Sequence, residues 1–257
     1  MIRDSDLAEA FQVPLDLLPF VPELLADLWD LGGWHEVIID LLRPLKLPVE
    51  STRVLDVGCG KGAVSIHLAK HLGFSTHGVD FFEPFVENAR SRAVDHEVQH
   101  LCSFELADAR DAVRRHQGFD VAVCASIGGV LGDHASCIGQ LRRTVRPGGY
   151  LVLDDGFLAG TERPDRQDWG HYVPYEETLR QIRAHGDDLV QETRIPPENM
   201  HAMDQRYLEA IARRASDIAD RHPELADALA RHVEWQREEG EAWETHVQSA
   251  VWMLRRT

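Results

Sequence analysis

The most informative stretch of this chain is Val54-Leu55-Asp56-Val57-Gly58-Cys59-Gly60-Lys61-Gly62-Ala63. An apolar run of strand length leads into three alternating glycines, and a helical pattern follows them. The missing Cβ atoms allow a ligand to approach the backbone, and the first N–H groups of a helix attract polar or negatively charged groups. The stretch therefore predicts a strand, a ligand-binding turn and a helix, in that order.

The same alternation of strand and helix continues along the chain. Strands are expected at 54–57, 75–80, 98–106, 119–124 and 150–154, and helices at about 63–71, 84–93, 109–116 and 134–145. Such alternation indicates βαβ units with right-handed crossovers and a parallel sheet.

The last hundred residues follow a different pattern. A helix is expected at 175–184 and a strand at 189–195, then helices at 200–219 and 223–239 and a strand at 246–256. We expect the helical pair, at about 198–242, to be an insertion before the last strand. The domain that carries it should span residues 51–257.

Residues 1–50 are expected to form a helical lid. Prolines interrupt this segment, and apolar residues recur at helical spacing over 24–31 and again over 37–42. Two short amphipathic helices fit this pattern, and each needs a partner surface for its apolar side. Together with the insertion, they are expected to cover the mouth of the active site.

Composition excludes several classes of function. The 257 residues carry 27 Lys+Arg and 43 Asp+Glu, a formal net charge of −16, which disfavours binding to nucleic acid or to an anionic membrane surface. Four scattered cysteines and the absence of a signal peptide or an apolar span indicate a cytoplasmic protein with reduced thiols. Neither a C-x-x-C pair nor an H-E-x-x-H motif occurs, so no metal site is expected. The oligomeric state is left open.

Two cofactors compete for the glycine turn. Gly58-x-Gly60-x-x-Ala63, with Asp80 about 20 residues downstream, fits the dinucleotide fingerprint, so an NAD(P)-dependent oxidoreductase is one alternative. However, Asp56 at the strand end would repel a pyrophosphate. The glycine pattern is also more compact than the fingerprint requires.

Five segments in order resemble the class I S-adenosylmethionine-dependent methyltransferases: 56–62, 78–80, 107–109, 119–124 and 145–152. The resemblance implies an α/β, Rossmann-like class I methyltransferase fold, with a mostly parallel seven-stranded sheet flanked by helices. It also implies S-adenosyl-L-methionine as the cofactor. The residues expected to bind that cofactor, with Phe81 packing on its planar adenine, are Asp56, Gly58, Cys59, Gly60, Gly62, Asp80, Phe81, Asp108, Ala109, Cys124 and Ser126.

A methyltransferase needs to align an acceptor with a methyl group that the cofactor already activates. A hydroxyl acceptor would also need a base, for which His134 and Asp155 are the candidates. Residues expected to contact a small-molecule acceptor are Trp34, Trp169, His171 and Tyr172.

Structural roles compete with several of these assignments. His134 could be a polar residue at a helix start, Asp108 a helix N-cap, and Phe81 or Trp34 part of the packing. A third hypothesis is a protein that binds the cofactor without catalysis. The acceptor, and whether O, N, C or S is methylated, stay open at this point.

Overall fold

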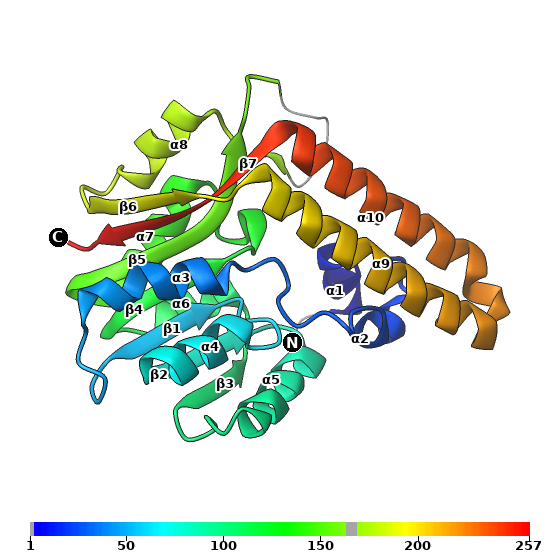
Figure 1. The fold of residues 1–257 in the computed structure, drawn as a ribbon, viewed down its shortest axis with the longest axis horizontal. Helices are drawn as coiled ribbons and strands as arrows, with labels where there is room; N and C mark the ends of the chain where they lie inside the picture. The colour runs from blue at the N-terminus through cyan, green and yellow to red at the C-terminus, as the bar shows by residue number, and fades with distance from the viewer. Residues whose placement is uncertain (1–2, 163–168) are drawn as a thin grey trace. The chain divides into compact units, whose positions relative to one another are not determined.

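A seven-stranded sheet forms the centre of the larger of two compact units (Figure 1), in a computed structural model that describes residues 3–162 and 169–257. The strands are β1 Arg53–Val57, β2 Ser75–Asp80, β3 Cys102–Leu106, β4 Phe119–Ala125, β5 Val145–Leu158, β6 Asp188–Arg194 and β7 Val247–Arg255. Their order is β3-β2-β1-β4-β5-β7-β6. The first five pair in parallel, whereas β7 runs antiparallel to β5 and β6. The expected fold class is confirmed.

Two groups of helices flank the sheet. One comprises α3 His35–Leu42, α4 Ala63–Leu72 and α5 Glu83–Asp95; the other comprises α6 Ala109–Arg115, α7 His134–Thr144 and α8 Tyr175–Ile182. Side chains alternate along a strand. Asp56 on β1 accordingly meets Ser65 of α4, while Leu55 and Val57 join the core beside α6 and α7.

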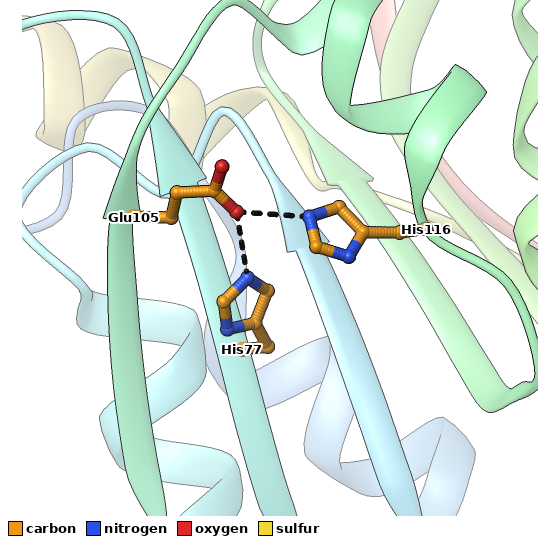
Figure 2. A group of neighbouring side chains, drawn as sticks. All are labelled: His77, Glu105 and His116. Atoms are coloured by element: carbon orange, nitrogen blue, oxygen red, sulfur yellow. Dashed lines mark hydrogen bonds and ion pairs between the residues drawn. The ribbon is translucent and has the colours of Figure 1, made fainter.

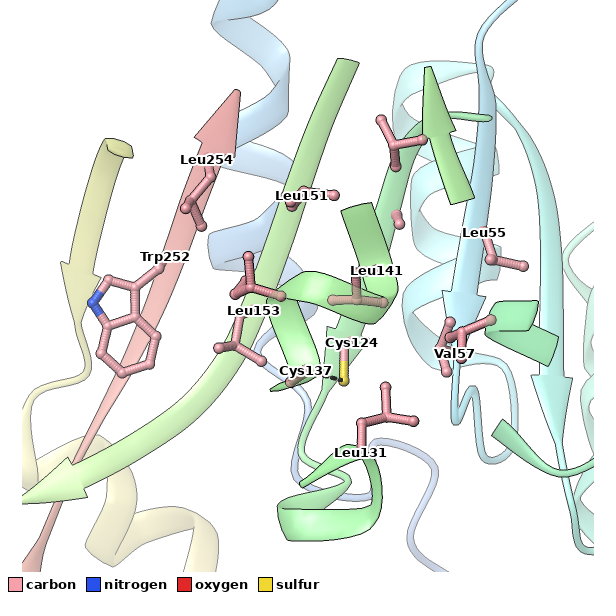
Figure 3. Packing of buried hydrophobic residues seen from close by; sticks show 14 of the residues in the cluster. Leu55, Val57, Cys124, Leu131, Cys137, Leu141, Leu151, Leu153, Trp252 and Leu254 are labelled. Carbon is pink, nitrogen blue, oxygen red and sulfur yellow. Dashed lines mark hydrogen bonds between the residues drawn. The ribbon is translucent and has the colours of Figure 1, made fainter. Parts of the chain in front are cut away.

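The main core lies between the sheet and the second helix group (Figure 3). Leu55, Leu141, Leu151 and Trp252 are fully buried there. Burying one such side chain stabilises the fold by about 1.5–3 kcal/mol. This core fixes the carboxyl ends of β1, β4 and β5 relative to one another.

The smaller unit consists of residues 1–29 and 196–245. Its helices are α1 Asp4–Ala10, α2 Val21–Leu24, α9 Pro197–Arg221 and α10 Ala226–His246, the last of which ends at the border. Asp27 joins the N-terminal segment to α9 through Arg213, at 2.8 Å, and Arg214. This division differs from the expected one, because residues 30–50 belong with the sheet. The lid function stays a prediction.

Some local expectations were wrong. The helix expected over 24–31 was not found, because α2 ends at Leu24. Separate turns follow it and bury Leu28, four residues after the buried Leu24, so the apolar spacing resembles that of a helix. The strand expected from residue 98 begins at Cys102, because residues 98–101 form a turn that closes on α5. Among the described residues, no helix has the length and apolar character needed to cross a membrane.

Candidate active site

The glycine turn lies at the carboxyl end of β1. Gly58, Gly60 and Gly62 have φ of +74°, +51° and +77°, which L side chains rarely adopt. A Cβ on Gly58 would lie 2.2 Å from Cγ2 of Ile127, the second residue after β4. The turn therefore requires glycine at this position for two reasons, and it contacts the β4 loop directly.

Asp56 is buried beneath this turn, at the N-terminus of α4. Its Oδ2 accepts hydrogen bonds from Ser65 N at 3.1 Å and Ser65 Oγ at 2.7 Å. Burial raises the pKa of Asp56 to about 6, although the Ser65 hydrogen bonds oppose this shift. The adjacent Cys59 thiol is also buried, and burial raises its pKa, so it stays protonated.

Asp80 links the end of β2 to the glycine turn. Its Oδ2 accepts a hydrogen bond from Gly60 N at 2.9 Å, and its Oδ1 accepts one from Phe82 N at 3.0 Å. Burial raises the pKa of this carboxyl. Phe82 packs edge-on against Phe85, whereas the neighbouring Phe81 is only half-buried. The position of Phe81 is thus compatible with stacking on a planar ligand.

Asp108 is the N-cap of α6, which is the structural role that competed with its assignment to the cofactor. Its Oδ1 accepts a hydrogen bond from Arg110 N at 2.7 Å, and its Oδ2 lies 2.5 Å from Arg110 Nη2. The Arg110 guanidinium holds the pKa of this carboxyl below its usual range. Ala109 begins the helix and is half-buried.

Cys124 and Ser126 differ in their surroundings, although both belong to the end of β4. The Cys124 thiol points into the main core, 3.7 Å from Cys137 Sγ (Figure 3), so only its backbone could contact a ligand. Ser126 is exposed, with φ of +53°, and its N–H donates to Asp154 O at 2.9 Å. This strained residue places the β4 loop beside Asp154 of β5.

Asp154 connects β5 to the segment before α3. The sequence placed it at the end of the fifth strand but predicted no partner for it. Its buried Oδ2 accepts a hydrogen bond from Trp34 N at 2.7 Å, which fixes the half-buried Trp34 at this edge of the sheet. Burial raises the pKa of Asp154 to about 8, although the Trp34 N–H opposes this shift.

Asp155 lies between two buried histidines. His134 Nε2 is 3.5 Å from Asp155 Oδ2, and His171 Nε2 is 3.7 Å from Asp155 Oδ1. Burial alone would raise the pKa of this carboxyl, but the two imidazoles together hold it below its usual range. The structure thus joins the two expected catalytic residues and adds His171, which had been assigned to the acceptor.

The imidazole of His134 is 1% exposed, and within the described structure neither ring nitrogen has a hydrogen-bond partner, since Nε2 only approaches Asp155 at ion-pair distance. A buried polar atom without a hydrogen bond destabilises the folded state unless a ligand or a water molecule supplies that bond. Aromatic rings enclose the pair of histidines: Trp252 lies edge-on to His134 at 6.0 Å, and Tyr172 contacts His171 at 3.8 Å between centroids. Trp169 packs edge-on against Tyr172, and both are buried.

Sequence reasoning missed Trp252, which β7 brings to His134 from the far end of the chain. The sequence pattern showed that Trp252 and Val251 lie on opposite faces of a strand. It did not show which helix Trp252 faces.

Comparisons with known proteins agree on one family. A profile of the methyltransferase domain matches residues 48–194. The 27-O-demethylrifamycin SV methyltransferase of Amycolatopsis mediterranei is 30% identical over 188 residues, covering 71% of this chain and 66% of that protein. A ubiquinone biosynthesis O-methyltransferase of Hydrogenovibrio crunogenus is 29% identical over 142 residues, covering 50% of this chain and 56% of that one. The chain thus spans just over half to about two thirds of these relatives' lengths.

One solved structure shows the likeness of fold. The S-adenosylmethionine-dependent methyltransferase of Geobacter sulfurreducens, in complex with S-adenosyl-L-homocysteine, superposes with a TM-score of 0.78 at 21% identity. The alignment covers 93% of this chain and 98% of that one.

Proposed function

Because this chain belongs to the class I S-adenosylmethionine-dependent methyltransferases, we propose that it methylates a hydroxyl group of a small-molecule acceptor. The observation that carries this proposal is the buried His134–Asp155 pair. A hydroxyl is a weak nucleophile, and a positioned imidazole that removes its proton typically contributes 10²–10⁴-fold to the rate. An amine or thiolate acceptor would not need this pair.

In this mechanism, His134 accepts the proton of the acceptor hydroxyl. Asp155 holds the imidazole through Nε2, at 3.5 Å, and stabilises the positive charge that forms on the ring. The acceptor hydroxyl would supply a hydrogen-bond partner for His134 Nδ1, one of the two ring nitrogens that have none among the described residues. His171 holds the second carboxylate oxygen of Asp155, so it is a positioning residue.

The residues around the glycine turn fit S-adenosylmethionine. Its activated methyl group supplies the electrophile. Three positive-φ glycines shape the tight turn after β1, Asp80 offers a carboxylate for hydroxyl groups, and the half-buried Phe81 offers a ring face. We assign Asp108 to orientation of the adjoining loop, because Arg110 already engages its carboxylate.

Methylation on oxygen is also supported by the names of the relatives. Both curated relatives act on oxygen according to their names, one on a rifamycin and one in ubiquinone biosynthesis. The enclosed aromatic residues Trp169, Tyr172 and Trp252 suit an apolar or aromatic acceptor. The cytoplasmic location and the lack of a nucleic-acid partner stay predictions.

Calorimetry and an acceptor screen test this function together. S-adenosylmethionine should bind, and S-adenosylhomocysteine should be released when phenolic or macrocyclic alcohols are added. Tight binding of a reduced nicotinamide dinucleotide, with no binding of S-adenosylmethionine, would support the oxidoreductase alternative. Turnover with a hydroxyl acceptor would exclude a cofactor-binding protein without catalysis.

A further inference from the structure

A second cluster of chemically active side chains lies outside the proposed active site. It consists of His77 on β2, Glu105 on β3 and His116, which directly follows α6 (Figure 2). We propose that these three residues bind one divalent transition-metal ion with the preferences of Zn²⁺. The proposal is independent of the methyltransferase function.

The geometry of the cluster is close to that of a metal site. Glu105 Oε2 lies 3.2 Å from His77 Nε2 and 2.9 Å from His116 Nε2, and all three ligand atoms lie within 4.8 Å of one another. Ligand atoms bound to a tetrahedral Zn²⁺ at about 2.0–2.1 Å are roughly 3.3–3.4 Å apart. Two imidazoles and a carboxylate favour Zn²⁺ and similar metals over Ca²⁺ or Mg²⁺, which prefer all-oxygen sites.

Neighbouring groups orient two of the three ligands. Arg115 Nη2 binds Glu105 Oε1 at 2.7 Å, which leaves Oε2 directed at both histidines. Ser103 Oγ lies 2.8 Å from His77 Nδ1 and 3.2 Å from Thr76 O. When the Ser103 hydroxyl donates to that carbonyl, it accepts from Nδ1–H of His77, so the Nε2 lone pair faces the carboxylate. A cation between them satisfies both groups, and such outer hydrogen bonds are typical of metal-bound histidine.

The site is partly exposed, and the cavity beside it opens at the amino-terminal ends of β1 and β2. His77 and His116 line a cavity of about 360 Å³ that also includes Arg53 and Ser75, the first residues of β1 and β2. The glycine turn follows the opposite end of β1. The cavity therefore gives an ion access and leaves room for water as a fourth ligand, without involving the methyl-transfer site.

Titration of the metal-free, full-length protein with ZnCl₂ tests the proposal, with Co²⁺ absorption as a second probe. We expect one ion per chain, and His77→Gln, His116→Gln and Glu105→Gln should each weaken binding by about tenfold or more. His67→Gln is the matched control, because His67 stacks on His35 in a separate histidine cluster, with ring centroids 4.0 Å apart. This control should bind Zn²⁺ as the unmodified protein does.

Absence of binding would overturn the proposal, and so would an affinity that falls with His67→Gln but not with the three ligand variants. X-ray absorption at the zinc edge on the unmodified protein covers the case in which a variant fails to fold. Two imidazoles and oxygen ligands are expected there, and sulfur ligation would contradict the assignment.

Discussion

Asp155 receives an imidazole on each carboxylate oxygen and is buried among aromatic rings. An ionised carboxylate in such surroundings is stabilised only by its partners, so the three side chains must be considered together. The sequence identified His134 from its place after β4, and Asp155 from the end expected for the fifth strand at residue 154, although β5 continues to Leu158. It could not show that His171 reaches the same carboxylate, because a loop of unpredictable path brings it there.

Replacement of His134 should abolish most of the turnover. His134→Gln is expected to reduce kcat by about 10²–10⁴-fold with a hydroxyl acceptor, because no group then removes the proton. Partial rescue should follow at alkaline pH, where a phenolic acceptor ionises by itself. Steady-state assays across pH would check this, with His185→Gln as the control, since His185 is exposed and donates to a backbone carbonyl, that of Ala135. An equal decrease of kcat in His134→Gln and His185→Gln would argue against His134 as the base.

Asp154 should make the protein less stable as the pH rises. Its pKa of about 8 lies above the ordinary value near 4, so the native state binds more protons between these two pH values. Stability therefore falls as pH increases across that window. From pH 5 to pH 8, the stability of Asp154→Asn relative to the unmodified protein should rise by up to about 4 kcal/mol, since each pH unit contributes about 1.4 kcal/mol.

Urea denaturation at several pH values would measure this difference. Asp188→Asn is the control, because Asp188 is exposed and its variant should show the same pH dependence as the unmodified protein. If the free energies of unfolding of Asp154→Asn and of the unmodified protein differed by the same amount at every pH, the raised pKa of Asp154 would be contradicted.

At the scale of the element, the glycine turn shows how far the sequence could predict the fold. Its spacing gave the strand, the turn and the helix, because each follows from local conformational preference. Cys124 had been expected at the cofactor, and only the packing of α7 on β4 shows that its thiol belongs to the core. The cluster of His77, Glu105 and His116 was missed for a related reason: its three residues lie on separate elements with no motif spacing.

Gly58→Ala should disturb the turn and weaken binding of S-adenosylmethionine by at least about tenfold. The added Cβ would meet Ile127 Cγ2 at 2.2 Å, in a backbone with φ of +74°. Gly118→Ala is the matched control, because φ is +77° there and nothing lies within 4 Å of the added Cβ. Both variants strain the backbone, but only Gly58→Ala should impair the turn.

Calorimetry with S-adenosylmethionine would separate the effect of backbone strain from that of the clash with Ile127. The double variant Gly58→Ala/Ile127→Ala should recover part of the affinity, because Ile127→Ala removes the clashing methyl group. Unchanged affinity in Gly58→Ala would show that the turn does not bind the cofactor.

At the scale of the whole molecule, the chain leaves and re-enters its smaller unit. Residues 1–29 and 196–245 are far apart in sequence but share ion pairs, and Asp27 contacts both Arg213 and Arg214. The net charge of −16 excluded some partners, but it did not reveal which carboxylates join these segments. Long-range pairing of this kind has no local signal in a sequence.

Asp27→Asn should destabilise the smaller unit by about 0.5–1 kcal/mol near pH 7, the range of partly exposed ion pairs. Hydrogen bonds from the two arginines lower the pKa of Asp27, so its contribution is present above pH 4 and is lost as the pH falls. Hydrogen exchange should accelerate in α1 and α2. Glu234→Gln is the control, because its partner Arg237 lies on the same helix.

Transfer of a deuterated methyl group tests the assignment of activity most directly. The full-length protein would be incubated with S-adenosylmethionine carrying a CD₃ group and with phenolic and macrocyclic alcohols, and the products analysed by mass spectrometry and NMR. We expect CD₃ on oxygen of an acceptor, with the product lost in His134→Gln and retained in His185→Gln. A label on carbon or nitrogen, or bound cofactor with no labelled product, would contradict the proposed O-methyltransferase.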